Sequence, residues 1–417
     1  MILIAVALLA SAGSSGLGAS LTVPRESERL TPSGELQSHA TASPVPLKDL
    51  TSPNPQEVGN FGNSVAIYGS TLVIGAPGEA VSGHAGAGDV YVFNDKTSQL
   101  IFTLSSPNPQ TDGSFGWSVA ISSSTIVVGA PGEKPYGLVD AGHAYTFNAA
   151  TGALKSKLST PNAQKDGEFG FAVGIYSTRV VVGAPYENAS GVLDAGHAYT
   201  FNANTGARNS TLNSSDPQKY GAFGTSVAIS STRVVVGAPD ETTDAYAQAG
   251  NIYVFNDKTP GLVAALSSPN AMAFGEFGIS VAILGTTVFA GAWGENASGH
   301  IGAGNVYSFD AKTNAVILTF SSPNAQQLGE FGRSVAISGT TLVIGAPGET
   351  VSNALDAGRA YTFNATSGGL VSTLVSVNSQ QYGGFGLSAA IGGTTIAFGA
   401  PYESAYGLYQ AGHAYLQ

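Results

Sequence analysis

The sequence predicts an all-β fold, a seven-bladed β-propeller whose four-stranded antiparallel blades form a ring closed by an N-terminal strand. The first observation is a repeat: variants of FGNSVAIYGSTLVIGAP, which begins at Phe61, recur seven times, every 54 residues, up to Phe385. A constant period of this kind is typical of arrays of identical supersecondary units. In addition, each period contains four strand-like segments, and the last period lacks its fourth segment, which has a counterpart near the N-terminus.

The composition fits one large domain and excludes some functions. Of the 417 residues, 43% are apolar and only 10% are charged, and the 55 glycines fall mostly at fixed places in the period. These glycines therefore mark turns and close strand contacts. The formal charge of -11 argues against nucleic acid as a partner, because binding to a phosphate backbone needs a basic patch. Since the chain has no cysteine, disulfides and thiolate metal sites are excluded.

Four segments of the first period are expected to be strands, and turn residues separate them. Residues 64–69 alternate small and branched side chains, which suits a strand crowded near the axis of a ring. Residues 71–77 are almost continuously apolar, as expected for a strand covered on both faces, and Pro77 ends it. Residues 87–94 place Tyr91 and Phe93 on one face, and residues 100–107 form the fourth strand.

The two ends of the chain predict how the ring closes. Seven periods account for residues 40–417, and the last copy stops after its third strand-like segment. Residues 45–56 are similar to the fourth segment of the next period, since Leu50 aligns with Leu104 and Pro53 with Pro107. We therefore expect the N-terminal segment to complete the seventh blade, which joins the chain ends without a disulfide.

The N-terminus predicts export. Residues 2–12 form an apolar run of the length of a signal-peptide core, shorter than the about 20 residues of a bilayer span. We expect residues 1–19 to be either a cleaved signal peptide or an uncleaved anchor, which would be the only link to a membrane. The alternative is an apolar tail with no targeting role. Residues 20–39 are rich in Ser, Thr and Pro and are expected to be a linker before a propeller of residues 40–417.

The connections between the expected strands predict two unlike faces of the ring. Tight turns join the first strand to the second and the third to the fourth, on one face. The other two connections, 78–86 and 108–114 in the first copy, are longer and share the opposite face. Function generally lies on long loops held by a rigid scaffold. This long-loop face is therefore the candidate binding surface.

One glutamate recurs on the long-loop face in every copy, two residues after the second strand's proline or its replacement. The seven are Glu79, Glu133, Glu187, Glu241, Glu295, Glu349 and Glu403. One interpretation is a ring of carboxylates that binds a cation or another ligand. The alternative is that each carboxylate accepts hydrogen bonds from the backbone N–H groups of its own loop. No calcium-loop motif is present, and the sequence predicts no metal and no other cofactor.

Aromatic residues on the long loops vary from copy to copy, and the candidates for the ligand face are Tyr136, Tyr186, Trp293 and Tyr402. Trp293 replaces the proline of the other six copies. Exposed aromatic side chains stack on sugars or anchor protein partners. The alternative is packing between neighbouring loops. Because no HExxH motif and no G-x-S-x-G elbow occurs, the sequence predicts no catalytic residue.

The dipeptide Phe61-Gly62, followed by Gly75-Ala76-Pro77, resembles the FG-GAP repeat of integrin α-subunit propellers and of many microbial exported proteins. The resemblance extends over residues 40–417, with seven Phe-Gly pairs, six Gly-Ala-Pro triplets and one Gly-Ala-Trp variant. It implies a seven-bladed propeller, an extracellular setting and a role in adhesion or in protein and glycan binding. Calcium-binding members carry an acidic loop between the two motifs. No Asp or Glu stands there in any copy, so the resemblance is to the calcium-free microbial type.

Three functions remain compatible with these observations. The leading hypothesis is an exported or cell-surface, non-enzymatic propeller that binds a protein or glycan through its long-loop face. The second is a structural subunit of an extracellular or surface-layer assembly, because the charge is low and the blades are uniform. The third is a polysaccharide-active lyase or hydrolase, which would need a cluster of unlike residues that breaks the sevenfold pattern. The sequence indicates no oligomeric state.

Overall fold

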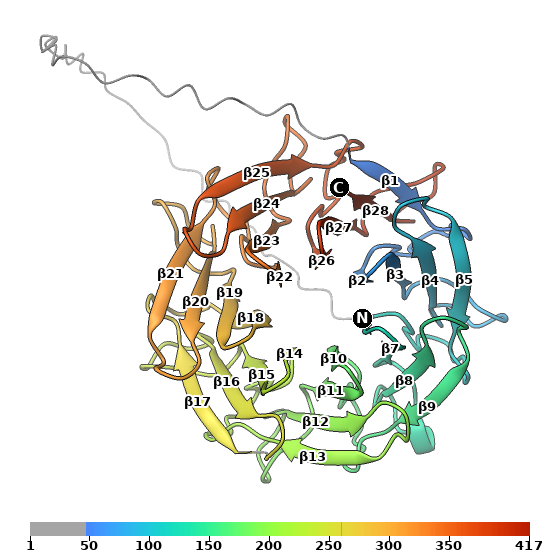
Figure 1. Cartoon of the computed structure of the whole chain (residues 1–417), viewed down its shortest axis with the longest axis horizontal. Helices are drawn as coiled ribbons and strands as arrows, with labels where there is room; N and C mark the ends of the chain where they lie inside the picture. Colours follow the sequence, from blue (N-terminus) through green and yellow to red (C-terminus); the bar gives the residue numbers. More distant parts are fainter. Residues whose placement is uncertain (1–46, 260) are drawn as a thin grey trace, which may run out of the picture. The chain divides into compact units, whose positions relative to one another are not determined.

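The computed structural model describes residues 47–259 and 261–417, which form seven four-stranded antiparallel sheets arranged as a ring (Figure 1). The predicted all-β, seven-bladed propeller is confirmed. Among the described residues the one helical element is a short 3-10 helix, η1 (Pro135–Gly137). No helix in the described part of the chain is long and apolar enough to cross a membrane. The predicted leader (1–19) and linker (20–39) lie outside the described residues.

The strands of each blade follow one another from the centre of the ring to its rim (Figure 1). Blade 1 comprises β2 (Ser64–Tyr68), β3 (Thr71–Ala76), β4 (Asp89–Asn94) and β5 (Leu100–Ser105); blade 2 comprises β6 (Ser118–Ile121), β7 (Thr125–Ala130), β8 (His143–Asn148) and β9 (Leu154–Leu158). Blade 3 comprises β10 (Val173–Tyr176), β11 (Arg179–Ala184), β12 (His197–Asn202) and β13 (Arg208–Leu212); blade 4 comprises β14 (Ser226–Ile229), β15 (Arg233–Ala238), β16 (Asn251–Asn256) and β17 (Leu262–Ser267). Blade 5 comprises β18 (Phe277–Leu284), β19 (Thr287–Ala292), β20 (Asn305–Asp310) and β21 (Val316–Ser321); blade 6 comprises β22 (Ser334–Ser338), β23 (Thr341–Ala346), β24 (Arg359–Asn364) and β25 (Leu370–Val375). Blade 7 comprises β26 (Ser388–Gly392), β27 (Thr395–Ala400), β28 (His413–Leu416) and β1 (Lys48–Thr51).

The ring closes through the two ends of the described chain. β1 pairs antiparallel with β28, so that Lys48 lies opposite Leu416 and Thr51 opposite His413. Figure 1 shows β1 beside β28, the first and the last strand of the chain. The N-terminal strand is therefore the outermost strand of blade 7, in the place that the sequence predicted for it.

The apolar core consists of layers between neighbouring blades. In β3, Leu72 and Ile74 pack in the layer shared with blade 7, whereas Val73 packs in the layer shared with blade 2. All three side chains have no exposed surface. Each second strand is therefore covered on both faces, which is why its sequence is a continuous apolar run.

The phenylalanine of each Phe-Gly pair anchors its own blade. Phe61 is fully buried, and its ring lies 5.8 Å from that of Tyr91 and 6.2 Å from that of Phe93 on β4. Aromatic pairs at these separations stabilise a core beyond the area they bury. The alternating Tyr and Phe of the third strand are therefore core residues.

The glycines of the two motifs fasten one blade to the next. A Cβ on Gly75 would lie 2.0 Å from the backbone oxygen of Gly116, which belongs to the Phe-Gly pair of blade 2. Ser64 Oγ donates a hydrogen bond of 2.8 Å to the same oxygen. At the closure, a Cβ on Gly399 of blade 7 would lie 1.8 Å from the backbone oxygen of Gly62. Glycine is required here because two backbones are in direct contact.

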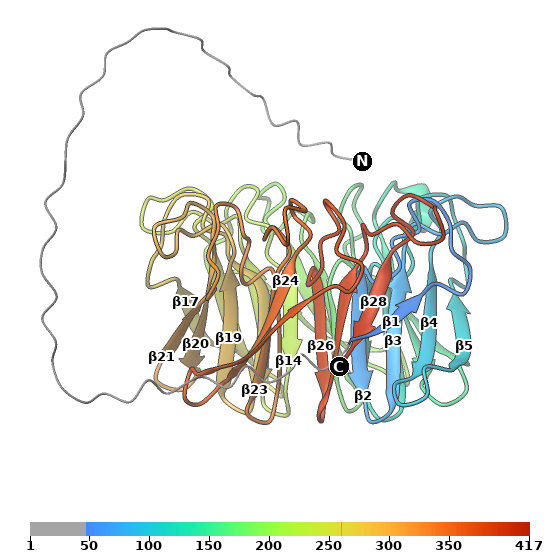
Figure 2. The ribbon, with the colours of Figure 1, turned by 90° about the horizontal axis from the view of Figure 1, so that it is seen from above.

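The two faces of the ring differ in the way the sequence predicted. Figure 2 shows the long loops gathered at one end of the ring and tight turns at the other. The innermost strands β2, β6, β10, β14, β18, β22 and β26 begin at the long-loop face and surround a central channel. Residues placed just before these strands therefore lie at the mouth of that channel.

Candidate functional site

The seven recurring glutamates lie at the base of the long loops, and their side chains are buried. Their exposed fractions are 0% or 1%. Each carboxylate accepts a hydrogen bond from the tyrosine of the third strand in its own blade, as Glu133 Oε2 does from Tyr145 Oη at 2.6 Å. These carboxylates therefore do not reach the surface of the long-loop face.

In blades 1, 2, 5 and 6 a hydroxyl group from the preceding blade also donates to the carboxylate, whereas in blades 4 and 7 the equivalent serine donates to the tyrosine. Ser106, which follows β5 of blade 1, donates to the carboxylate of Glu133 in blade 2. Ser52, which follows β1, donates in the same way to Glu79, so the contact also crosses the ring closure. We call each group of glutamate, tyrosine and hydroxyl a clasp. Among the described residues the clasp carboxylates bond side chains, not the loop backbone N–H groups that the alternative interpretation invoked.

Burial changes the protonation of the Glu79 clasp. It raises the pKa of Glu79 to about 7, although the hydrogen bonds from Ser52 and Tyr91 oppose the rise. The negative charge of Asp89, at the start of β4, raises the pKa of Glu79 further. In blade 2 the equivalent residue is His143, whose Nδ1 lies 2.7 Å from Glu133. Because the clasp glutamates are buried and, as between Ser106 and Glu133, bond across neighbouring blades, the clasps hold blades together. We do not include them in the candidate binding site.

The residues that vary most at the centre of the long-loop face are those that follow the Phe-Gly pairs. We call them the channel mouth: Asn63, Trp117, Phe171, Thr225, Ile279, Arg333 and Leu387. They line a hollow of about 240 Å³ at the central channel. The serines and valines beside them repeat almost unchanged, so the variation at the mouth is a local departure from the sevenfold symmetry of the ring.

One side of the channel mouth is aromatic. The rings of Trp117 and Phe171 are 5.7 Å apart, and Tyr186 stands edge-on to Phe171 at 6.1 Å. Asn63 Nδ2 donates to the backbone oxygen of Trp117 at 2.9 Å, and Trp117 is 38% exposed. A second hollow, of about 370 Å³, lies between the loops of blades 1 and 2 and is lined in part by Trp117.

The other side combines a cation, an indole and carboxylates. The guanidinium of Arg333 lies 5.4 Å from the centre of the Trp293 ring, a cation–π distance. Trp293 Nε1 donates to Glu276 Oε2 at 2.5 Å. These contacts fix the orientation of both the arginine and the indole.

Three glutamates precede Phe-Gly pairs on blades 3, 5 and 6. Burial raises the pKa of Glu168, Glu276 and Glu330 to about 7 in each case. The charges of Asp140 and Asp166 raise the pKa of Glu168 further. The mouth region therefore gains negative charge as the pH rises through about 7.

The structure places two of the four aromatic candidates from the sequence against the channel mouth: Tyr186 packs on Phe171, and Trp293 on Arg333. Tyr402 is 40% exposed, and burial raises the pKa of its hydroxyl. Tyr136 lies on η1 and is 90% exposed.

Sequence reasoning missed Trp117, Phe171 and Arg333. The available signal was their variation at one fixed position of the repeat. In the described residues, no group of three or more His, Asp and Glu side chains is arranged to hold a metal ion.

A family model described as the FG-GAP repeat matches five stretches of the chain: residues 48–93, 103–147, 153–201, 208–255 and 321–363. Together these stretches make up more than half of the sequence. The first begins with β1 and ends on β4, so the model recognises strands on both sides of the closure. A search of curated proteins found no match to the chain.

Proposed function

The chain belongs to the FG-GAP repeat family, and we propose that it is an exported, non-enzymatic propeller that binds a protein partner at its channel mouth. The family's propeller fold suggests a binding or structural role. One observation supports binding in particular: tryptophan, phenylalanine and arginine occupy the ring position that differs between otherwise similar blades. Trp and Arg dominate the energetically important centres of protein interfaces.

The chemistry of the mouth favours a protruding protein segment over a sugar. Trp117 and Phe171 offer an apolar surface beside a hollow, into which an apolar side chain of the partner can insert. On the other side of the mouth, Glu276 and Glu330 match a basic residue elsewhere in the same protein segment. Because these side chains are already held by neighbours, little conformational entropy is lost when the partner binds.

Two features outside the mouth support the extracellular or cell-surface part of this function. Residues 2–12 have the apolar character of a signal-peptide core. The repeat resembles those of extracellular adhesion propellers. Binding of this kind involves no catalytic step, so turnover on a panel of polysaccharides would contradict it.

The channel mouth can be tested with residues that other blades already carry there. We would combine Trp117→Asn, Phe171→Thr and Arg333→Leu, which copy Asn63, Thr225 and Leu387. The control is Tyr176→Ser on the tight-turn face. Tyr176 is 48% exposed, and blade 2 carries a serine at the equivalent position of the repeat. Purified proteins would be applied to arrays of extracellular proteins and of glycans, with and without divalent ions.

We expect the unaltered chain and the control to bind the same array protein, and the triple variant to bind it at least about tenfold more weakly. Absence of any bound protein, binding to glycans alone, or equal binding by the triple variant would contradict the proposal.

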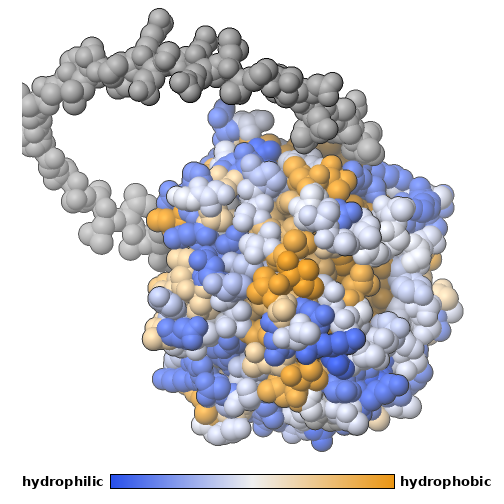
Figure 3. All heavy atoms as spheres, turned by 60° about the vertical axis from the view of Figure 1, so that its left-hand side comes forward, coloured by the Kyte–Doolittle hydropathy of each residue, from blue (hydrophilic) through white to orange (hydrophobic). Residues whose placement is uncertain are grey.

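A structural role is the second candidate, and the rim of the ring favours it. The outer strands β17, β21 and β25 carry no charge, and each begins with two exposed apolar residues, 39–66% exposed: Leu262 and Val263, Val316 and Ile317, Leu370 and Val371. Figure 3 turns this side of the ring forward and shows apolar side chains gathered on it. Uncharged edge strands are prone to pair with other chains. We propose a second copy of this chain as the partner.

Sedimentation at increasing protein concentration tests this association. The double variant Ile317→Lys, Val371→Lys introduces lysine on blades 5 and 6 at the position where blade 2 natively carries Lys155. We expect the unaltered chain to form oligomers and the double variant to remain monomeric. A chain that stays monomeric at every concentration would exclude a structural role through this rim.

A further inference from the structure

A polar pocket lies in blade 7, where the two ends of the described chain meet. Its volume is about 400 Å³, in the range of about 300–1,000 Å³ that is typical of small-molecule sites. It is lined by Asp49 and Thr51 of β1, by Asn378 of the loop before β26, and by Tyr406 and His413. We call it the seam pocket. None of these residues takes part in the channel mouth.

The carboxylate of the seam pocket is fixed in place. His413 Nδ1 lies 2.8 Å from Asp49 Oδ1, and Asn378 Nδ2 donates to Asp49 Oδ2 at 2.9 Å. Asn378 Nδ2 also donates to the clasp residue Tyr415 at 3.0 Å. Each carboxylate oxygen that accepts one such bond keeps the capacity for another. Asp49 therefore presents two oriented acceptors to the pocket.

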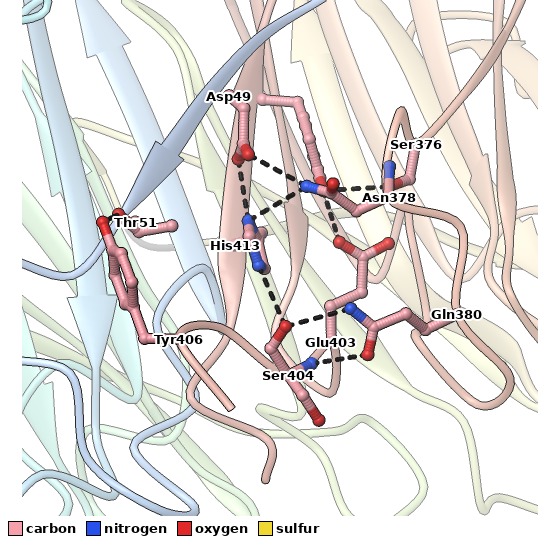
Figure 4. A network of polar contacts seen from close by, with 10 residues as sticks. Asp49, Thr51, Ser376, Asn378, Gln380, Glu403, Ser404, Tyr406 and His413 are labelled. Carbon is pink, nitrogen blue, oxygen red and sulfur yellow. Dashed lines mark hydrogen bonds and ion pairs between the residues drawn. The ribbon is translucent and has the colours of Figure 1, made fainter. Parts of the chain in front are cut away.

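An aromatic ring stands across from this carboxylate. Tyr406 is 75% exposed, and its hydroxyl lies 2.8 Å from Thr51 Oγ1, which sets the direction of the ring. Figure 4 shows Tyr406 on one side and Asp49, His413 and Asn378 on the other. The pocket thus combines an exposed aromatic surface with fixed hydrogen-bond acceptors.

The seam pocket breaks the sevenfold repeat. At the position of Asp49, four blades carry threonine: Thr103, Thr211, Thr319 and Thr373. At the position of Tyr406, four blades carry serine: Ser82, Ser190, Ser298 and Ser352. Blade 2 has a tyrosine, Tyr136, but Lys157 stands in place of the aspartate. The combination of carboxylate and aromatic ring occurs in blade 7 alone.

The charge balance of the pocket selects between two ligand classes. Burial lowers the pKa of His413, but the hydrogen bond and charge of Asp49 outweigh this, so the pKa is raised. Where the imidazole is protonated, the His413–Asp49 pair has no net charge, and a cation gains little from it. A ligand with several hydroxyl groups can still donate to the free lone pairs of Asp49.

We propose that the seam pocket binds a carbohydrate residue, which stacks on the ring of Tyr406 and donates hydroxyl hydrogen bonds to the carboxylate of Asp49. Aromatic surfaces pack against the apolar face of a sugar, while buried or fixed acceptors discriminate between its hydroxyl groups. This site is independent of the channel mouth and of its protein partner.

The repeat supplies the variants for a test. Tyr406→Ser and Asp49→Thr each introduce the residue that four other blades carry, so both are compatible with a blade. Because Tyr406 is largely exposed, its replacement leaves the core intact. The matched control is Tyr136→Ser in blade 2, which removes an exposed tyrosine with the same positive φ of 55°. The probes are glucose, galactose, mannose and N-acetylglucosamine in calorimetric titrations, with tetramethylammonium as the cationic competitor.

We expect at least one sugar to bind the full chain, and its affinity to fall at least about tenfold in Tyr406→Ser and in Asp49→Thr. The Tyr136→Ser control and the channel-mouth triple variant should bind it as the unaltered chain does. No binding of any sugar, binding of tetramethylammonium instead, or sugar binding that survives Tyr406→Ser would overturn the assignment. Loss of sugar binding in the triple variant would place the sugar at the channel mouth and equally overturn it.

Discussion

Leu50 offers a direct test of how the ring closes. It is 8% exposed and packs in the apolar layer between blades 7 and 1, together with Phe61 and Leu416. Replacing a buried leucine by alanine costs about 2–5 kcal/mol, because apolar contacts are lost and a cavity remains. For a ring of this size such a loss lowers the melting temperature by about 3–6 °C.

The repeat provides the matched control for this change. Leu104 occupies the same position on β5, is 4% exposed, and differs in that its blade is continuous in sequence. We expect Leu50→Ala and Leu104→Ala to lower the melting temperature, followed by circular dichroism, to a similar extent. If Leu104→Ala melts earlier while Leu50→Ala melts like the unaltered chain, β1 does not close the ring in solution and the reasoning is refuted.

Two further predictions concern the clasps and the motif glycines. Burial raises the pKa of Glu79 from 4.5 to about 7, so between these pH values the folded chain binds more protons than the unfolded chain. Glu79 therefore contributes about 3 kcal/mol to the free energy of unfolding below pH 4.5, and this contribution is lost as the pH rises through about 7. Melting temperatures should therefore be higher near pH 5 than near pH 8, with a smaller difference in Glu79→Gln, and a rise over the same interval would contradict this. Gly75→Ala should cost at least about 1–3 kcal/mol in urea unfolding, since its Cβ would lie 2.0 Å from a backbone oxygen of blade 2. Gly369→Ala, whose nearest contact is the Ser367 hydroxyl at 3.4 Å, is the control, and equal effects of the two substitutions would show that the blades do not pack this closely.

Several features of the fold were predictable because they depend on local sequence. The constant period determines the number of blades, and alternating or continuous apolar runs identify the strands. The predicted segments 64–69 and 71–77 match β2 and β3 within one residue at their ends. The predicted third segment began at residue 87, whereas β4 begins at Asp89. Gly88 has a φ of +82° and lies against the backbone of Phe115, so it cannot belong to the strand.

The candidate site was less predictable, because it depends on contacts between blades. Glu79 and its counterparts were visible as a recurring residue, but the hydrogen-bond partners of Glu79 are a tyrosine of the same blade and a hydroxyl group of the preceding one. Similarly, nothing in the local sequence around Trp117 and Arg333 shows that ring closure places both at one channel mouth.

The sequence by itself determined the architecture of this protein: all-β, seven repeated blades, and an N-terminal strand that completes the last one. The tertiary structure decided which polar residues are buried in clasps and which line hollows. It also decided that Asp49 meets His413, 364 positions away, because closure of the ring pairs the first strand with the last. Solvent exposure and hydrogen-bond partners depend on the packing of neighbouring blades. The local sequence of a repeat, which is similar in every copy, therefore does not specify them.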